Sequence, residues 1–201
     1  MPRTDDIEPA IAAVLERSLR KRLHGPYSVR TDAQVRSGLE RLFAAQGHCG
    51  VVVKDLRRLA GGASKEMFCC SLRHDALDAP ERLVLRMDRL ESIIETSRQR
   101  EAEAVIAARA VVPVPLVRYL DQAGEFLGQS GLITSFVEGV TQPRDQGGSG
   151  VSGLGTNYGA AVARIAPQLL DNLVAIHTLD WRAACLPSFE APDAYPQQAA
   201  L

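Results

Sequence analysis

Three features of the sequence could bind a phosphorylated ligand, and the first is a glycine turn. Gly61, Gly62 and Ser64 lie between two strand-like stretches. Glycine lets the backbone approach a ligand closely, and a serine hydroxyl beside free amides suits phosphate oxygens. A glycine pair is also common in ordinary hairpin turns, so the turn alone does not identify a phosphate site.

The second feature is Arg86, a cation inside the apolar stretch LVLRM at residues 83–87. In a strand, Arg86 lies on the face opposite Leu83 and Leu85. A buried cation needs an anionic partner, either in the protein or in a ligand. The alternative is a strand whose second face is in water, which antiparallel sheets often have. Both interpretations stay open at this point.

The third feature is Glu101. On the helix predicted for residues 90–110 it shares a narrow arc with three apolar residues: Ile94, Val105 and Ala108. A buried carboxylate needs a cation, and Arg86 is available. Alternatively, Glu101 is solvated or pairs with Arg98 one turn earlier on the same helix. Glu95 and Glu103 lie off the arc and are predicted to be solvated.

The elements that position these residues are predicted to form an antiparallel sheet. Alternating apolar residues and turn signals predict strands at 51–59, 67–72, 82–87, 116–120 and 127–137. The helix at 90–110 separates the third strand from the fourth. The resulting order is three strands, one helix and two strands.

Helices are predicted on both sides of this unit. One spans 7–23 and a second begins with a capping box at Thr31 and Gln34. The glycine-rich stretch at 139–157 predicts a loop. A helix over 158–179 must kink or restart at Pro167, and the tail after Trp181 has no evident element.

Composition excludes several classes of protein. The chain has 201 residues, of which 46% are hydrophobic and 23% charged, and its net charge is −1. The hydrophobic share is too high for a disordered chain, and the charge argues against a nucleic-acid partner. No membrane-spanning stretch or secretory signal is evident, and the four cysteines are typical of reduced thiols. We therefore expect a cytoplasmic protein without a membrane partner.

The ordered motifs resemble the aminoglycoside phosphotransferase and choline-kinase-like family, within the protein-kinase-like fold. The resemblance runs from about residue 51 to 181 and is closest to the branch found beside acyl-CoA dehydrogenases. Its motifs are LAGGAS at 59–64, LVLR at 83–86, Arg100-Glu101, VPVP at 112–115, ITSFVEG at 133–139 and LVAIHTLDW at 173–181.

The resemblance implies roles for individual residues. The complete family member would use ATP with Mg²⁺ and transfer phosphate to a small-molecule hydroxyl group. The residues implied to bind the nucleotide are Gly61, Gly62 and Ser64 over the phosphates, Arg86 against phosphate, Glu101 as its ion-pair partner, and Ser135, Phe136 and Val137 around adenine. Packing roles are expected for His177 and Trp181.

The resemblance also predicts an α+β fold with three segments. Residues 1–48 form an N-terminal helical segment, and residues 49–139 form a kinase-like small lobe of five antiparallel strands plus a helix. Residues 140–201 comprise a loop, the start of a helical large lobe and a tail, so the large lobe is expected to be incomplete.

One departure from the family pattern limits the functional prediction. The family's His-Gly-Asp motif with its following Asn, and its later metal-binding Asp, do not occur in the sequence. No catalytic or metal-binding residue is therefore assigned. The chain is predicted to be the N-terminal part of a phosphotransferase and inactive as given. The alternative is a non-catalytic module that binds a nucleotide or another protein through an exposed apolar surface.

Overall fold

The computed structural model of the chain describes residues 16, 19–20, 30–59, 65–89, 97–139, 159–184 and 186–189. Four sequence predictions lie wholly or mostly outside these residues. They are the helix at 7–23, the turn containing Gly61, Gly62 and Ser64, the glycine-rich loop, and the tail after residue 189.

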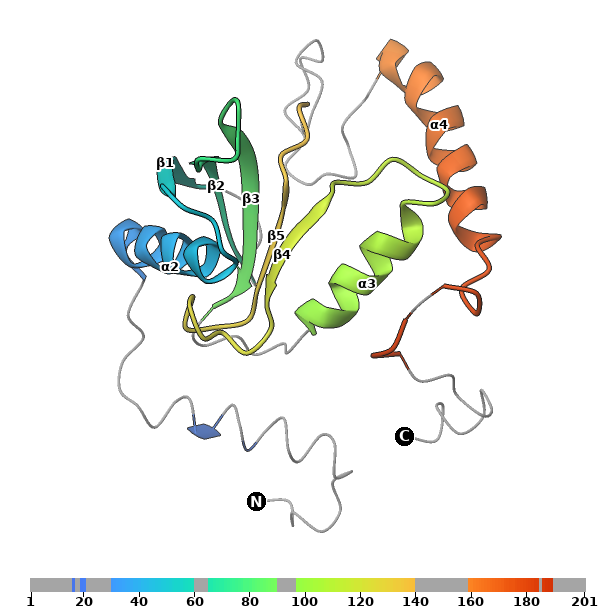
Figure 1. Ribbon diagram of the computed structural model, residues 1–201. Coiled ribbons are helices and arrows are strands. Elements are labelled where there is room, and N and C mark those ends of the chain that lie inside the picture. Colours follow the sequence, from blue (N-terminus) through green and yellow to red (C-terminus); the bar gives the residue numbers. More distant parts are fainter. Residues whose placement is uncertain are drawn as a thin grey trace.

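Five antiparallel strands form one sheet in the order β1-β2-β3-β5-β4 (Figure 1). The strands are β1 (Val52–Arg58), β2 (Lys65–Arg73), β3 (Glu81–Asp88), β4 (Val117–Asp121) and β5 (Gly131–Ser135). β3 is central, since its Leu85 lies opposite Phe68 of β2 and Ile133 of β5. The predicted sheet of five antiparallel strands, with a helix between the third and fourth strands in sequence, is confirmed.

Within the described ranges, the sheet is accompanied by the helices α2 (Asp32–Ala45), α3 (Arg98–Ala108) and α4 (Gly159–His177). The predicted capping box of α2 is confirmed, because the Thr31 side chain accepts from the Gln34 amide and the Gln34 side chain accepts from the Thr31 amide. The prediction that α3 begins at residue 90 is wrong. Ser97 has an extended backbone and caps α3 by accepting from the Arg100 amide.

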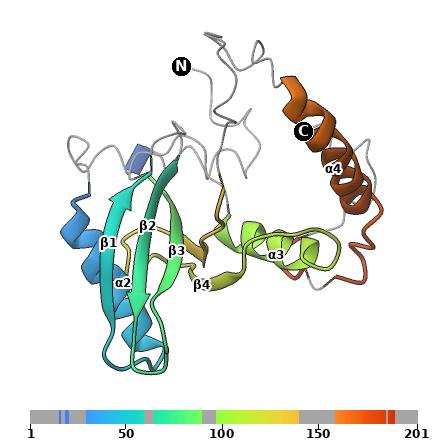
Figure 2. The same ribbon diagram turned by 90° about the horizontal axis from the view of Figure 1, so that it is seen from above.

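The core lies between α2 and one face of the sheet. The predicted stripe on α2 is buried, with Val35, Leu39, Leu42 and Phe43 each at most 2% exposed. On β3, Leu83 and Leu85 point into this core and are fully buried, whereas Arg86 points to the opposite face. Figures 1 and 2 show α2 and α3 on opposite sides of the sheet.

Beyond α3, on the side away from the strands, lies α4 (Figures 1 and 2). It is a single helix that contains Pro167, so the predicted restart there does not occur. Six of its large apolar side chains are 48–64% exposed: Ile165, Leu169, Leu170, Leu173, Val174 and Ile176. Among the described residues, no helix combines the length and the apolar character needed to cross a bilayer.

The turn between β4 and β5 packs closely against α2. The Asp121 carboxylate organises this turn by accepting from the amides of Glu125, Phe126 and Leu127. Gly38 faces it from α2, and a Cβ added at Gly38 would lie 2.7 Å from the Phe126 carbonyl oxygen. The helix and the turn can therefore approach this closely only because residue 38 has no side chain.

We predict that Gly38→Ala destabilises the protein, although alanine is normally preferred over glycine inside a helix by about 1 kcal/mol. The overpacked contact with the turn should lower the free energy of unfolding by roughly 1–3 kcal/mol. Urea unfolding followed by circular dichroism measures the change. Ser37→Ala is the control, because Ser37 is the exposed neighbour on the same helix. A Gly38→Ala variant as stable as wild type would contradict the close contact.

Candidate functional site

Arg86 and Glu101 meet on the face of the sheet opposite α2. The Nη1 atom of Arg86 lies 2.9 Å from Oε1 of Glu101, and the two side chains are 44% and 25% exposed. Alternation along β3 directs Arg86 toward α3, and the Ser97 cap places Glu101 in the first turn of that helix. The pair is therefore formed within the chain and remains accessible from solvent.

Arg98 extends this pair into a longer arrangement of charges. Its Nη1 donates to Oε2 of Glu101, and its Nη2 lies 3.5 Å from Oδ1 of Asp88. Asp88 in turn accepts from Nζ of Lys65, its partner across the β2–β3 ladder. We call Lys65, Asp88, Arg98, Glu101 and Arg86 the charge network. Both partners considered for Glu101 from the sequence, Arg86 and Arg98, contact it.

A second ionic cluster lies on the α2 face of the sheet. Glu66 follows Lys65 on β2, points to the opposite face and is only 2% exposed. Its carboxylate accepts from Nη1 of Arg30 and from Nη1 of Arg58, the latter at 2.7 Å. A buried carboxylate held by two guanidinium groups is well compensated for the loss of water.

These two clusters anchor the first residues of β2, which follow the glycine turn directly. Gly61, Gly62 and Ser64 themselves lie outside the described residues. Lys65 is held on one face of the sheet by Asp88, and Glu66 is held on the other face by Arg30 and Arg58. The first two residues of β2 are therefore held by ion pairs on both faces of the sheet.

The segment from Ser135 to Val137 leaves β5 at the other end of β3. The Ser135 amide donates to the Leu116 carbonyl at 2.8 Å, and the Phe136 amide donates to the Arg82 carbonyl at 2.9 Å. The Arg82 guanidinium also lies 3.8 Å from the centre of the Phe136 ring. Protein acceptors therefore occupy the first two amides of this segment.

Val137 differs from its two neighbours. Its side chain is 64% exposed. Within the part of the chain that the structure describes, its amide meets no acceptor. Of the three residues implied to surround adenine, Val137 alone thus offers both an exposed apolar side chain and an amide available to a ligand.

The sequence prediction for Glu103 is wrong. It was predicted to be solvated but is only 5% exposed. It accepts from Gln99 and, at 3.0 and 2.7 Å, from the amide and hydroxyl of Ser188. Arg100 strengthens the link by donating to the Ser188 carbonyl at 2.8 Å. Sequence patterning missed this role because Ser188 lies 85 residues away.

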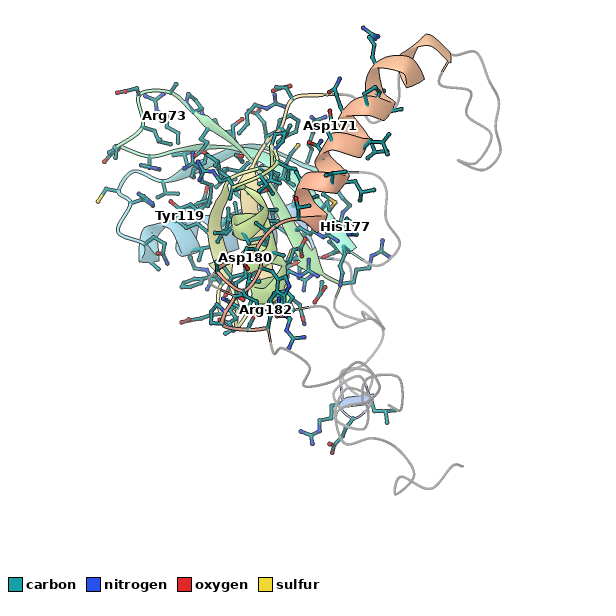
Figure 3. All side chains as sticks on the ribbon, turned by 90° about the vertical axis from the view of Figure 1, so that its right-hand side faces the viewer. Arg73, Tyr119, Asp171, His177, Asp180 and Arg182 are labelled. Atoms are coloured by element: carbon teal, nitrogen blue, oxygen red, sulfur yellow. The ribbon has the colours of Figure 1, made fainter. Side chains whose placement is uncertain are left out.

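Two further residues differ from their predicted packing roles. His177 is exposed and Trp181 is 44% exposed, so neither is buried among the described residues. Figure 3 shows His177 toward the end of α4, with Asp180 and Arg182 beyond it. Asp180 accepts from the Arg182 amide at 3.1 Å and forms a local turn. No contact joins these residues to Arg86 or Glu101.

A cavity of about 540 Å³ lies between α2 and the β4–β5 turn, lined in part by Arg30, Gln34 and Arg41. The predicted nucleotide-binding residues that the structure describes, Arg86, Glu101 and 135–137, do not line it. In the described ranges, no group of three or more His, Cys, Asp or Glu residues could hold a metal ion.

The sequence and the structure were compared with known proteins to identify the family to which the chain belongs. The sequence model of the family described as "Phosphotransferase enzyme family" matches residues 55–201. A crystal structure from Ralstonia eutropha JMP134, of a provisionally assigned aminoglycoside phosphotransferase, is 22% identical with a TM-score of 0.49. That match covers 80% of this chain and 43% of the other, so the chain spans less than half of that protein. No curated protein matched the sequence.

The link from Glu103 to Ser188 leads to a pH-dependent prediction. Burial alone would raise the pKa of Glu103, but hydrogen bonds from Gln99 and Ser188 and the charge of Arg100 lower it below the ordinary 4.5. A lowered pKa in the folded state stabilises the protein above the ordinary value. That contribution is lost as the pH falls through the folded-state pKa.

We therefore expect the stability difference between wild type and Glu103→Gln to be constant above pH 4.5 and to shrink below it. Urea unfolding at several values of pH between about 3 and 7 gives this difference. The glutamine variant should also be cleaved faster near residues 186–189 in limited proteolysis. A stability difference that does not change with pH would contradict the assigned pKa shift.

Proposed function

Since the chain belongs to the phosphotransferase enzyme family, we propose that it forms the nucleotide-binding part of an ATP-dependent phosphotransferase. The acceptor of the complete enzyme would be a hydroxyl group on a small molecule. The observation that carries the proposal is the Arg86–Glu101 pair, 2.9 Å apart and partly exposed on the face of the sheet beside α3. A cation held by a carboxylate is suited to bind the phosphates of a nucleotide.

The rest of the proposed site lies around this pair. Gly61, Gly62 and Ser64 would cover the phosphates, because their turn leads directly into Lys65 of the charge network. The Val137 amide would donate to the adenine ring, and the nearby Ser135 and Phe136 backbone would complete that edge. Arg86 belongs to β3, and Ser135 and Phe136 contact the same strand at its other end, which supports their acting on one extended ligand.

The chain's own residues would bind and orient the nucleotide without completing the transfer. Phosphoryl transfer depends mainly on positioning and on stabilising charge with metal ions. In the complete family member Mg²⁺ would neutralise charge on the phosphates. Neither the His-Gly-Asp motif nor its following Asn occurs among the 201 residues. We therefore expect binding of ATP without turnover, in the cytoplasm where ATP is abundant.

A second candidate function is a protein-interaction module. It is favoured by α4, whose large apolar side chains are about half exposed along its length. Contiguous exposed apolar surface commonly marks an interaction site. On this reading the sheet would be a scaffold, and adenine nucleotides would not bind.

Titration with ATP tests the proposal and discriminates between the two functions. We expect wild type to bind ATP and Arg86→Ala to bind at least about tenfold more weakly, because a charge-assisted contact with phosphate is lost. Isothermal titration calorimetry measures both dissociation constants. Arg73→Ala should bind like wild type, since Arg73 is an exposed cation at the far end of β2.

Three other results would each contradict a part of the proposed function. If wild type shows no heat of binding with ATP at millimolar concentration, the nucleotide-binding function is refuted. If ATP binds equally well to wild type and Arg86→Ala, the assignment of Arg86 to the phosphates is wrong. Turnover of ATP with an added hydroxyl acceptor would refute the expectation that these residues bind without catalysing.

A further inference from the structure

Arg98 is the most enclosed member of the charge network. Its side chain is 1% exposed, compared with 44% for Arg86. It is the first residue of α3 and lies immediately after the Ser97 cap. A guanidinium this deeply buried must be compensated by anionic partners, because water no longer solvates it.

Among the described residues, Arg98 has anionic partners on two different elements. Asp88 ends β3, and Glu101 lies one turn along α3. A guanidinium donates through a planar, rigid fork, so one that contacts both carboxylates fixes the distance between them. Arg98 therefore joins the first turn of α3 to the end of β3.

The Glu101 carboxylate divides its two oxygens between two cations. Oε2 accepts from the buried Arg98, and Oε1 lies 2.9 Å from the partly exposed Arg86. If Arg86 turned toward a ligand, Glu101 would still be held by Arg98. The buried contact thus keeps the carboxylate in place, while the exposed contact is free to adjust.

We propose that Arg98 is a positioning residue for nucleotide phosphates. It holds Glu101 and, through Glu101, the guanidinium of Arg86. Through Asp88 it is also linked to Lys65, the residue that follows the glycine turn. This inference rests on the proposed nucleotide-binding function and adds a residue that touches no ligand itself.

A positioning role and a merely structural role predict different results. A positioning residue acts only on ligands that carry phosphate, whereas a loss of structure weakens every contact with the nucleotide. Affinities for ATP and for adenosine, which shares the base and sugar but lacks phosphates, therefore separate the two roles.

The experiment uses the full chain and four variants: Arg98→Met, Arg98→Lys, Arg86→Ala and the double variant Arg86→Ala with Arg98→Met. NMR titration gives dissociation constants for ATP and adenosine, and urea unfolding gives stability. Arg118→Met is the matched control, because Arg118 forms an exposed ion pair with Glu81 at the edge of the same sheet.

We expect Arg98→Met to weaken ATP binding about tenfold and to leave adenosine binding unchanged. Arg98→Lys should lose less, since lysine keeps the charge but cannot contact both carboxylates through a fork. The double variant should bind ATP no more weakly than Arg86→Ala alone, because Arg98 acts through Arg86. Arg118→Met should match wild type for both ligands.

Three results would overturn the proposal. ATP binding by Arg98→Met equal to wild type would refute the positioning role and leave the proposed function intact, provided that Arg86→Ala is impaired. Equal losses for ATP and adenosine would make Arg98 merely structural. A wild-type chain that does not bind ATP would refute the proposed function and this inference with it. If Arg98→Met does not fold, Arg98→Lys decides by the same comparison of ligands.

Discussion

The need to compensate buried charge at one end of the sheet determines how the main parts of this structure fit together. Asp88 and Glu101 each contact two cations, and Glu66 does the same on the opposite face. A buried carboxylate with a single partner would retain part of its desolvation penalty. Sharing each carboxylate between two cations removes that penalty and also links separate elements, so β2, β3 and α3 are held at fixed positions.

Because successive side chains of β3 point to opposite faces of the sheet, its charged residue Arg86 lies away from the apolar core. Leu83 and Leu85 supply the apolar face that packs against α2, and Arg86 directly follows Leu85 in sequence but points the other way. The central strand therefore builds a dry layer on one side and an ionic layer on the other. The segment from Ser135 to Val137 leaves β5 and contacts the other end of β3, so this one strand lies beside both parts of the proposed nucleotide site.

Patterns of short period in the sequence were sufficient to predict much of this arrangement. The capping box at Thr31 and the alternation around Arg86 depend on neighbours within a few residues, and the structure agrees with both. The arc containing Glu101 led to the contact with Arg86, which is present, but it also left Glu103 solvated, which is wrong. The bridge through Arg98 depends on where α3 begins, which the extended Ser97 determines. Burial of Glu103 depends on Ser188, a contact between distant segments that no local pattern contains.

Two sides of α3 are held by different parts of the chain. Arg98 and Glu101 form ion pairs with residues of the sheet, whereas Arg100 and Glu103 form hydrogen bonds with Ser188 in the segment that follows α4. Positions 100 and 103 are separated from 101 by about 100° and 200° around the helix axis. One short helix therefore joins two segments that are far apart in sequence. The residues that follow α4 and the ion pair of Arg86 are held by side chains less than two turns apart on α3.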